Sequence, residues 1–181
     1  MKDYLPKLSI VNLVATAELG RRVNLQKLQN VKGFLYDLSI YRCAYLKDKK
    51  TRAKVLVFGT GKMISVGAKS LQDANRDLNY AATRLSQLDL IPTTRVTTKL
   101  QNIVATADIG QSISLEILAS KLPDCIYEPE QFPGAIYYAE ELEGASILIF
   151  ANGKMVLAGI KRQELLEAGR RIIGGLARQI L

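Results

Sequence analysis

The 181-residue chain contains no histidine and no tryptophan, and it has only two cysteines. Histidine is the usual general base and the commonest metal ligand, so its absence argues against most catalytic and metal sites. Cys43 and Cys125 stand in no metal-binding spacing such as Cys-x-x-Cys. We expect both to be small buried residues in a reducing intracellular setting. Paired acidic motifs and a phosphate loop are also missing, so we expect no enzyme activity, no cofactor and no metal.

Long apolar runs are absent as well. No stretch approaches the 18 or so residues that a membrane span needs, and no hydrophobic segment of a signal peptide follows Met1–Tyr4. We therefore expect an intracellular protein with no membrane partner. The length suits one or two domains, and 48% hydrophobic residues are ample for a core.

The same segment occurs twice in the chain. Ile10–Gly20 (IVNLVATAELG) returns as Leu100–Gly110, and Val55–Lys69 (VLVFGTGKMISVGAK) returns as Ile147–Lys161. The near-constant spacing predicts two tandem repeats, 8–91 and 92–181. Their link at 91–94 is too short for independent movement, so we expect one continuous structural unit. Two units related by a pseudo-twofold suit a nearly twofold ligand, of which duplex DNA is the commonest.

The net charge of +8 is unevenly distributed. Residues 1–91 contain 16 Lys and Arg against 7 Asp and Glu, whereas residues 92–181 contain 9 against 10. A basic surface favours polyanions, although charge that serves only solubility explains the excess equally well. The asymmetry makes the two repeats inequivalent, so such a scaffold can distinguish the two directions along a duplex.

Each repeat predicts the same order of elements. An apolar strand ends at Gly20 or Gly110, and a short helix follows with Asn24 or Ser114 as its N-cap. Further strands end in a hairpin, and a long amphipathic helix closes the repeat. The hairpin turns are predicted at Thr60-Gly61 and Asn152-Gly153. In the first repeat, Ser70 and Asp73 resemble a capping box at the start of the long helix.

The hairpin strands are apolar on both faces. Val55–Phe58 and Ile147–Phe150 do not alternate with polar residues, as a strand with one solvated face would. Two helices per repeat are enough to cover one face of the sheet. The sequence leaves open whether a second protein layer or a ligand covers the other face.

Three motifs together resemble one known family. They are the repeated N-[IL]-V-A-T, the repeated G-K-M-x-x-x-G-x-K, and YEPEQFPG at Tyr127–Gly134. Over about residues 8–178 the chain resembles the TATA-box-binding proteins, in their archaeal or eukaryotic core form. The resemblance implies an α+β fold: a pseudo-twofold saddle with a ten-stranded curved antiparallel sheet and four helices on its convex face. It also implies a general transcription initiation factor that binds and bends A/T-rich promoter DNA (the TATA box) in the minor groove. Such a factor acts in the cytoplasm or nucleoid of an archaeal cell, or in a eukaryotic nucleus.

The resemblance also implies which residues contact DNA. Asn12 and Asn102 would hydrogen-bond base acceptors at the central step. Phe132 with Phe150 would wedge a base step at one end, and Tyr41 with Phe58 would do so at the other. The remaining groove contacts are apolar: Val14, Leu56, Ile64, Val66, Val104, Leu148, Val156 and Ala158. Matched polar residues would contact phosphates: Arg42, Thr60, Lys62, Lys69, Asn152, Lys154 and Lys161. Glu128, Glu130 and Gln131 lie in the loop where this family docks a TFIIB-type factor, and through it RNA polymerase.

Several positions depart from the family pattern. Val66 and Ala158 replace the threonines expected before the glycine of G-K-M-x-x-T-G, and Tyr41 replaces the first-repeat wedging phenylalanine. Arg42 stands where a proline is expected, and Tyr138 where an arginine is expected. The chain therefore reads as a divergent member. The alternative is a divergent paralogue that acts mainly as a protein-interaction modulator, with weak or factor-dependent DNA binding. A homodimer of the free protein through its apolar face is a further expectation.

Overall fold

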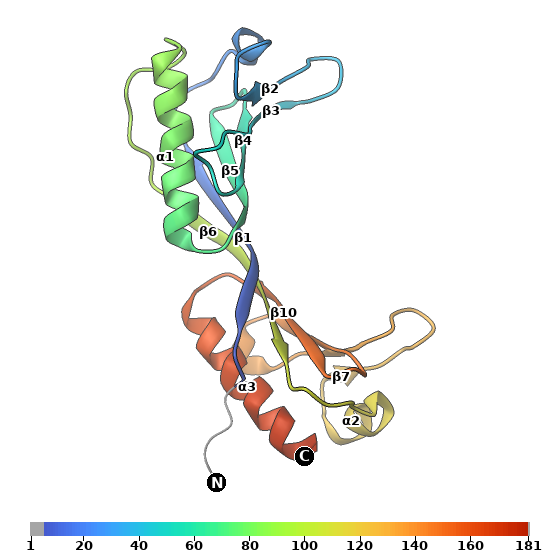
Figure 1. Ribbon diagram of the computed structural model, residues 1–181. Helices are drawn as coiled ribbons and strands as arrows, with labels where there is room; N and C mark the ends of the chain where they lie inside the picture. Colours follow the sequence, from blue (N-terminus) through green and yellow to red (C-terminus); the bar gives the residue numbers. More distant parts are fainter. Residues whose placement is uncertain (1–5, 181) are drawn as a thin grey trace. The chain divides into compact units, whose positions relative to one another are not determined.

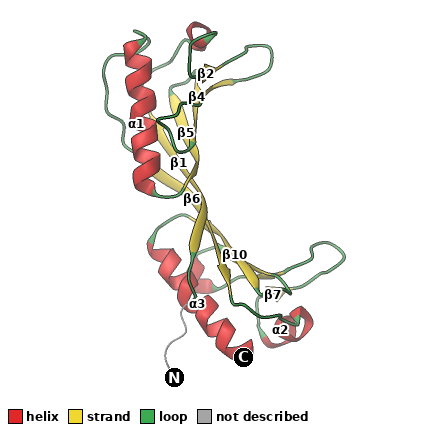
Figure 2. Cartoon of the chain, in the orientation of Figure 1, coloured by secondary structure: helices red, strands yellow, loops and turns green. Residues whose placement is uncertain are grey.

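The computed structural model describes residues 6–180 as a ten-stranded sheet with helices (Figures 1 and 2). Two sequence expectations fall partly outside the described residues: the one about a signal peptide, which concerns Met1–Tyr4, and the end of the second repeat at residue 181. The strand order is β2-β3-β4-β5-β1-β6-β10-β9-β8-β7, and every pairing that the structure gives is antiparallel. The first-repeat elements are β1 (Ser9–Glu18), the 3-10 helix η1 (Leu25–Leu28), β2 (Phe34–Leu35), β3 (Cys43–Leu46), β4 (Lys54–Phe58), β5 (Lys62–Ala68) and α1 (Leu71–Gln87). The second-repeat elements are β6 (Lys99–Asp108), α2 (Leu115–Lys121), β7 (Cys125–Ile126), β8 (Ala135–Tyr137), the 3-10 helix η2 (Glu140–Leu142), β9 (Ser146–Ile149), β10 (Lys154–Ile160) and α3 (Glu164–Ile180).

The contacts divide the chain into two compact units. One unit comprises Asn12–Gln101, and the other comprises the residues before Asn12 and after Gln101. Each unit therefore contains most of one repeat, and β1 and β6 each pass from one unit to the other. No described helix is long and apolar enough to span a membrane.

Burial along the strands follows the two-residue period of a pleated sheet. In β1, Leu13 and Ala15 are fully buried, whereas Asn12 and Val14, which alternate with them, are half-buried. The same pattern recurs in β6. One face of each unit's strands therefore forms the core, and the other remains partly open.

Helix α1 covers the buried face of its unit (Figure 1). The Ser70 hydroxyl accepts a hydrogen bond from the Asp73 N–H at 3.0 Å, which confirms the predicted N-cap. Asp77 of α1 is fully buried and accepts hydrogen bonds from the backbone N–H groups of Arg52 and Ala53 at 2.9 and 2.8 Å. A buried carboxylate thus fixes the loop before β4 to the helix.

The expected number of helices is partly wrong. The described chain contains three α-helices, because the first short helix is the 3-10 helix η1. Its N-cap Asn24 accepts from the N–H only two residues on, and the Gln29 N–H bonds back to Gln26, so the segment closes in three-residue turns. Ser114, the N-cap of α2, instead accepts from Ile117 three residues on.

Both hairpin turns lie one residue earlier than predicted. The Gly61 N–H donates to the Phe58 carbonyl at 2.9 Å, and the Gly153 N–H donates to that of Phe150 at 2.9 Å. The glycines therefore end the turns instead of occupying their centres. Gly61 has φ +94°, and a Cβ there would lie 1.9 Å from the Arg21 carbonyl oxygen. Only glycine fits this position.

The expectation for the two cysteines holds for one of them. Cys43 is buried, whereas Cys125 on β7 is only partly buried. Partial desolvation raises the pKa of the Cys125 thiol, so this thiol is less readily ionised than an exposed one.

Candidate nucleic-acid interface

The open face of each unit consists of half-buried apolar side chains on alternate strand positions. In β4 and β5, Leu56 lies opposite Ile64 in register, and Ile64 lies opposite Thr16 of β1. The second repeat matches this row, because Leu148 lies opposite Val156 and Val156 lies opposite Thr106. All the predicted apolar contact residues are half-buried positions of this face: Val14, Leu56, Ile64, Val66, Val104, Leu148, Val156 and Ala158.

Two asparagine amides add hydrogen-bonding groups to this face. Asn12 and Asn102 are half-buried, and the side-chain Oδ1 of each is fully buried with no hydrogen-bond partner among the described residues. A buried acceptor without a partner destabilises a fold by about 1–3 kcal/mol, so such groups often serve a ligand. The second hydrogen-bonding group of each amide is the Nδ2 donor.

Phe132 and Phe150 come together in the second-repeat unit. Their ring centroids lie 5.8 Å apart at 62°, an edge-to-face arrangement. Gly134 makes this possible, because a Cβ there would lie 2.9 Å from the Phe132 ring and 3.2 Å from the Phe150 ring. The structure therefore places the predicted wedge pair side by side.

The first repeat arranges its aromatic residues differently. Cys43 stands at the position of Gly134 and lies opposite Phe58 in register. Cys43 has a side chain at the position where the second repeat has glycine, and it is buried. The ring contact of Tyr41 is with Tyr45 instead, at 5.2 Å and 75°. A hydrogen bond with Cys43 raises the pKa of Tyr45, so its hydroxyl stays protonated.

The predicted phosphate contacts lie at the surface. The turn residues hold the lysines that follow them, because Thr60 Oγ1 accepts from the Lys62 N–H at 3.4 Å and Asn152 Oδ1 accepts from the Lys154 N–H at 3.1 Å. Both Lys62 and Lys154 line hollows, of about 670 Å³ and about 550 Å³ respectively. The remaining predicted phosphate contacts, Arg42, Lys69 and Lys161, are exposed.

Sequence reasoning missed some residues of this surface. Thr16 and Thr106 lie two positions beyond Val14 and Val104 on the same face, so the strand period could have identified them. Arg95 and Lys99 line the hollow beside Lys62. Arg95 and Lys99 are harder to identify from the sequence, because they lie between the repeats and at the start of β6, outside the repeated motif that contains Lys62.

The loop of Glu128, Glu130 and Gln131 is an exposed turn between β7 and β8. The N–H groups of Gln131 and Phe132 both donate to the Glu128 carbonyl at 2.9 Å. The first-repeat loop has the same backbone bonds, from Ile40 and Tyr41 to the Asp37 carbonyl at 3.1 and 2.8 Å. The two loops thus share one conformation and differ in chemistry. Among residues 6–180, no three His, Cys, Asp or Glu side chains gather as a metal site.

Comparison with known proteins agrees with this arrangement. The model of the family "Transcription factor TFIID (or TATA-binding protein, TBP)" matches residues 7–88 and 97–178. The tandem-repeat fold with its ten-stranded sheet thus defines a DNA-binding transcription factor, not an enzyme. TATA-box-binding proteins of Cenarchaeum symbiosum and Pyrococcus furiosus are each 36% identical to the chain, covering 92% of it and 92% and 88% of their own lengths. The solved structure of Methanococcus jannaschii TBP superposes with a TM-score of 0.81 at 27% identity, covering 97% of this chain and 100% of that one. The chain belongs to the TATA-binding protein family.

Proposed function

We propose that the chain is a general transcription initiation factor that binds A/T-rich promoter duplex through the open face in the minor groove. The observation that carries this proposal is the apolar open face with the two amides of Asn12 and Asn102. The minor groove of A·T pairs presents only acceptors, which match the Nδ2 donors, whereas G·C pairs add an amine donor. An apolar face can pack against A·T pairs, whereas the protruding amine of a G·C pair would prevent this close contact.

The same contact would bend the duplex. Phe132 and Phe150 form a ready wedge, and unstacking a base step costs a few kcal/mol that wider contact with the protein offsets. Lys62 and Lys154 at the hairpin turns would neutralise phosphates. Val66 and Ala158 keep the face apolar where the family has threonines, so binding would depend more on shape than on hydroxyl donors.

The acidic loop between β7 and β8 would recruit a TFIIB-type factor, and through it RNA polymerase. Glu128 and Glu130 are exposed on a turn that backbone hydrogen bonds hold in place, which suits steering of a basic partner. The curated relatives carry the name TATA-box-binding protein, which favours promoter binding over the alternative of a modulator with weak DNA affinity. An uncovered apolar face would also let two free copies pair, and duplex would then separate them.

The test is an anisotropy titration of a labelled TATA duplex, beside a duplex with its central A·T pairs replaced by G·C. We expect tighter binding of the TATA duplex, a steep loss of affinity with salt, and increased energy transfer between dyes at the duplex ends on bending. Equal affinity for both duplexes, or a flat salt response, contradicts the proposal.

The partner site is tested separately by adding the TFIIB-type factor to the protein–duplex complex. We expect Glu128→Lys with Glu130→Lys to leave duplex affinity intact and to weaken capture of the factor. The matched control is Glu164→Lys with Glu167→Lys on α3, which changes the net charge equally. Equal loss in both variants would exclude the loop as the docking site.

A further inference from the structure

The two repeats carry opposite charge at the same place in the fold. Residues 32–52 of the first repeat correspond to residues 123–143 of the second. Equivalent backbone bonds support this register: the Lys47 N–H donates to Gly33 at 2.9 Å, and the Tyr138 N–H donates to Asp124 at 3.0 Å. We name these stretches the basic segment and the acidic segment. The first has the cations Lys32, Arg42, Lys47, Lys49, Lys50 and Arg52 with two carboxylates, and the second has the anions Asp124, Glu128, Glu130, Glu140, Glu141 and Glu143 with no cation.

These charges are directed to the solvent. All six cations and all six anions are exposed. Within the described residues, the ion pairs that these twelve groups form are Arg52 with Asp73 and Glu143 with Arg162. Most of the two opposite charge sets is therefore available to a partner.

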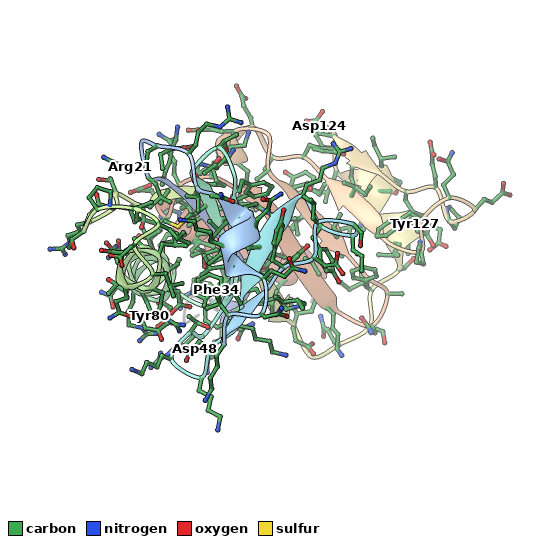
Figure 3. The ribbon with its side chains drawn as sticks, turned by 90° about the horizontal axis from the view of Figure 1, so that it is seen from above. Arg21, Phe34, Asp48, Tyr80, Asp124 and Tyr127 are labelled. Atoms are coloured by element: carbon green, nitrogen blue, oxygen red, sulfur yellow. The ribbon has the colours of Figure 1, made fainter. Side chains whose placement is uncertain are left out.

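Each segment also contains an edge strand with an exposed apolar residue. β2 and β7 stand at the two ends of the strand order. Leu35 on β2 is 57% exposed, and its equivalent Ile126 on β7 is 50% exposed. Figure 3 labels Phe34, the first residue of β2, and Asp124 and Tyr127, the residues that precede and follow β7 in the sequence. The Phe34 N–H on the outer edge of β2 already donates to the Val31 carbonyl at 2.9 Å, so the features that the two edges share are one exposed apolar residue and charge of one sign.

We propose that the protein associates with a second copy of itself, β2 of one copy docking against β7 of the other. The charges are complementary in this head-to-tail arrangement, and Leu35 and Ile126 would meet at its centre. Such an interface is heterologous, so it can continue to further copies. Each edge strand has only two residues, so the association is weak and salt-sensitive. It uses neither the open face nor DNA, and it competes with a factor docked on Glu128 and Glu130.

Sedimentation velocity of the DNA-free protein tests this, at about 100 μM in about 0.05 M and about 0.5 M salt. We expect association at low salt and monomer at high salt. Lys49→Glu with Lys50→Glu should weaken association about tenfold or more, and so should Glu140→Lys with Glu141→Lys at the equivalent positions. Combining all four substitutions leaves four cations against four carboxylates in the basic segment and two cations against four carboxylates in the acidic segment, so this variant should associate no better than either double variant. The matched control, Lys27→Glu with Arg171→Glu, lies outside both segments and should leave the association almost unchanged.

Three results would overturn the proposal. One is a monomer at both salt concentrations. Another is a four-substitution variant that melts like wild type and associates as tightly, because charge complementarity would then be irrelevant. The third is association that survives charge reversal and is lost on Val14→Glu, which would assign it to the open face. None of these results affects the promoter-binding proposal, since duplex is absent throughout.

Discussion

Replacing Asn102 by leucine should stabilise the fold and weaken DNA binding at once. Leucine has nearly the shape of asparagine but no polar atoms, so Asn102→Leu removes the buried Oδ1 that lacks a partner. Removing such a group contributes about 1–3 kcal/mol of stability. For a chain of this length, each kcal/mol raises Tm by about 2–4 °C.

The effect on binding has the opposite sign. If Nδ2 donates to a base acceptor, the leucine leaves that acceptor buried and unpaired in the complex. The cost is about 1–3 kcal/mol, or roughly a 5- to 150-fold rise in Kd. Asn12→Leu should behave in the same way, because its Oδ1 is also buried and unpaired.

Ser65 provides the matched control. Its hydroxyl is also buried with no hydrogen-bond partner in the described part of the chain, but Ser65 is fully buried on the core side of β5. Ser65→Ala should therefore raise stability by about 1 kcal/mol and leave Kd unchanged. Calorimetry and anisotropy on the three variants give both quantities. If the asparagine variants melt lower than wild type while binding the TATA duplex equally well, the amides serve the fold and the reasoning is refuted.

Three further predictions concern the wedge, the phosphate contacts and the pH response. In Gly134→Ala the Cβ would lie 2.9 Å from the Phe132 ring, 3.2 Å from the Phe150 ring and 2.9 Å from the Ile149 carbonyl oxygen, so the substitution should displace the rings and also lower Tm. At a temperature where the variant is folded we expect a smaller bend by energy transfer, and an unchanged bend would contradict the wedge. Lys62→Ala and Lys154→Ala should each reduce the slope of log K against log salt by about 0.9, whereas Lys27→Ala should leave it unchanged. The Lys50 N–H and the Tyr80 hydroxyl hold the pKa of Asp48 below its ordinary value of 3.8. The ionised form therefore stabilises the fold fully above pH 3.8, and this contribution is lost as pH falls below 3.8 through the lower pKa of the folded state. As pH is lowered from about 4 towards about 2, wild type should lose more stability than Asp48→Asn, and parallel melting curves would exclude this role.

Much of the fold could be predicted from local pattern. The duplication predicted two similar sets of strands and helices, and the N-caps Asn24, Ser70 and Ser114 lie where the sequence indicated. Capping and strand alternation are local properties, fixed by neighbouring residues. The apolar residues that the family resemblance named as DNA contacts all lie on the open face, in keeping with the strand period, and their contact with DNA stays a prediction.

Other features depend on residues far apart in the chain. The sequence could not show that Cys43 lies opposite Phe58, because the pairing of β3 with β4 sets that register. Nor could it show that Asp77 binds the loop before β4, or that the oxygens of Asn12 and Asn102 are buried without partners. The charges of the two segments were visible in the sequence, but only strand order places them on the two edges of the sheet. The sequence by itself determined which elements form and which residues alternate along them; the tertiary structure decided which side chains meet, because burial and long-range contacts exist only once the strands have paired.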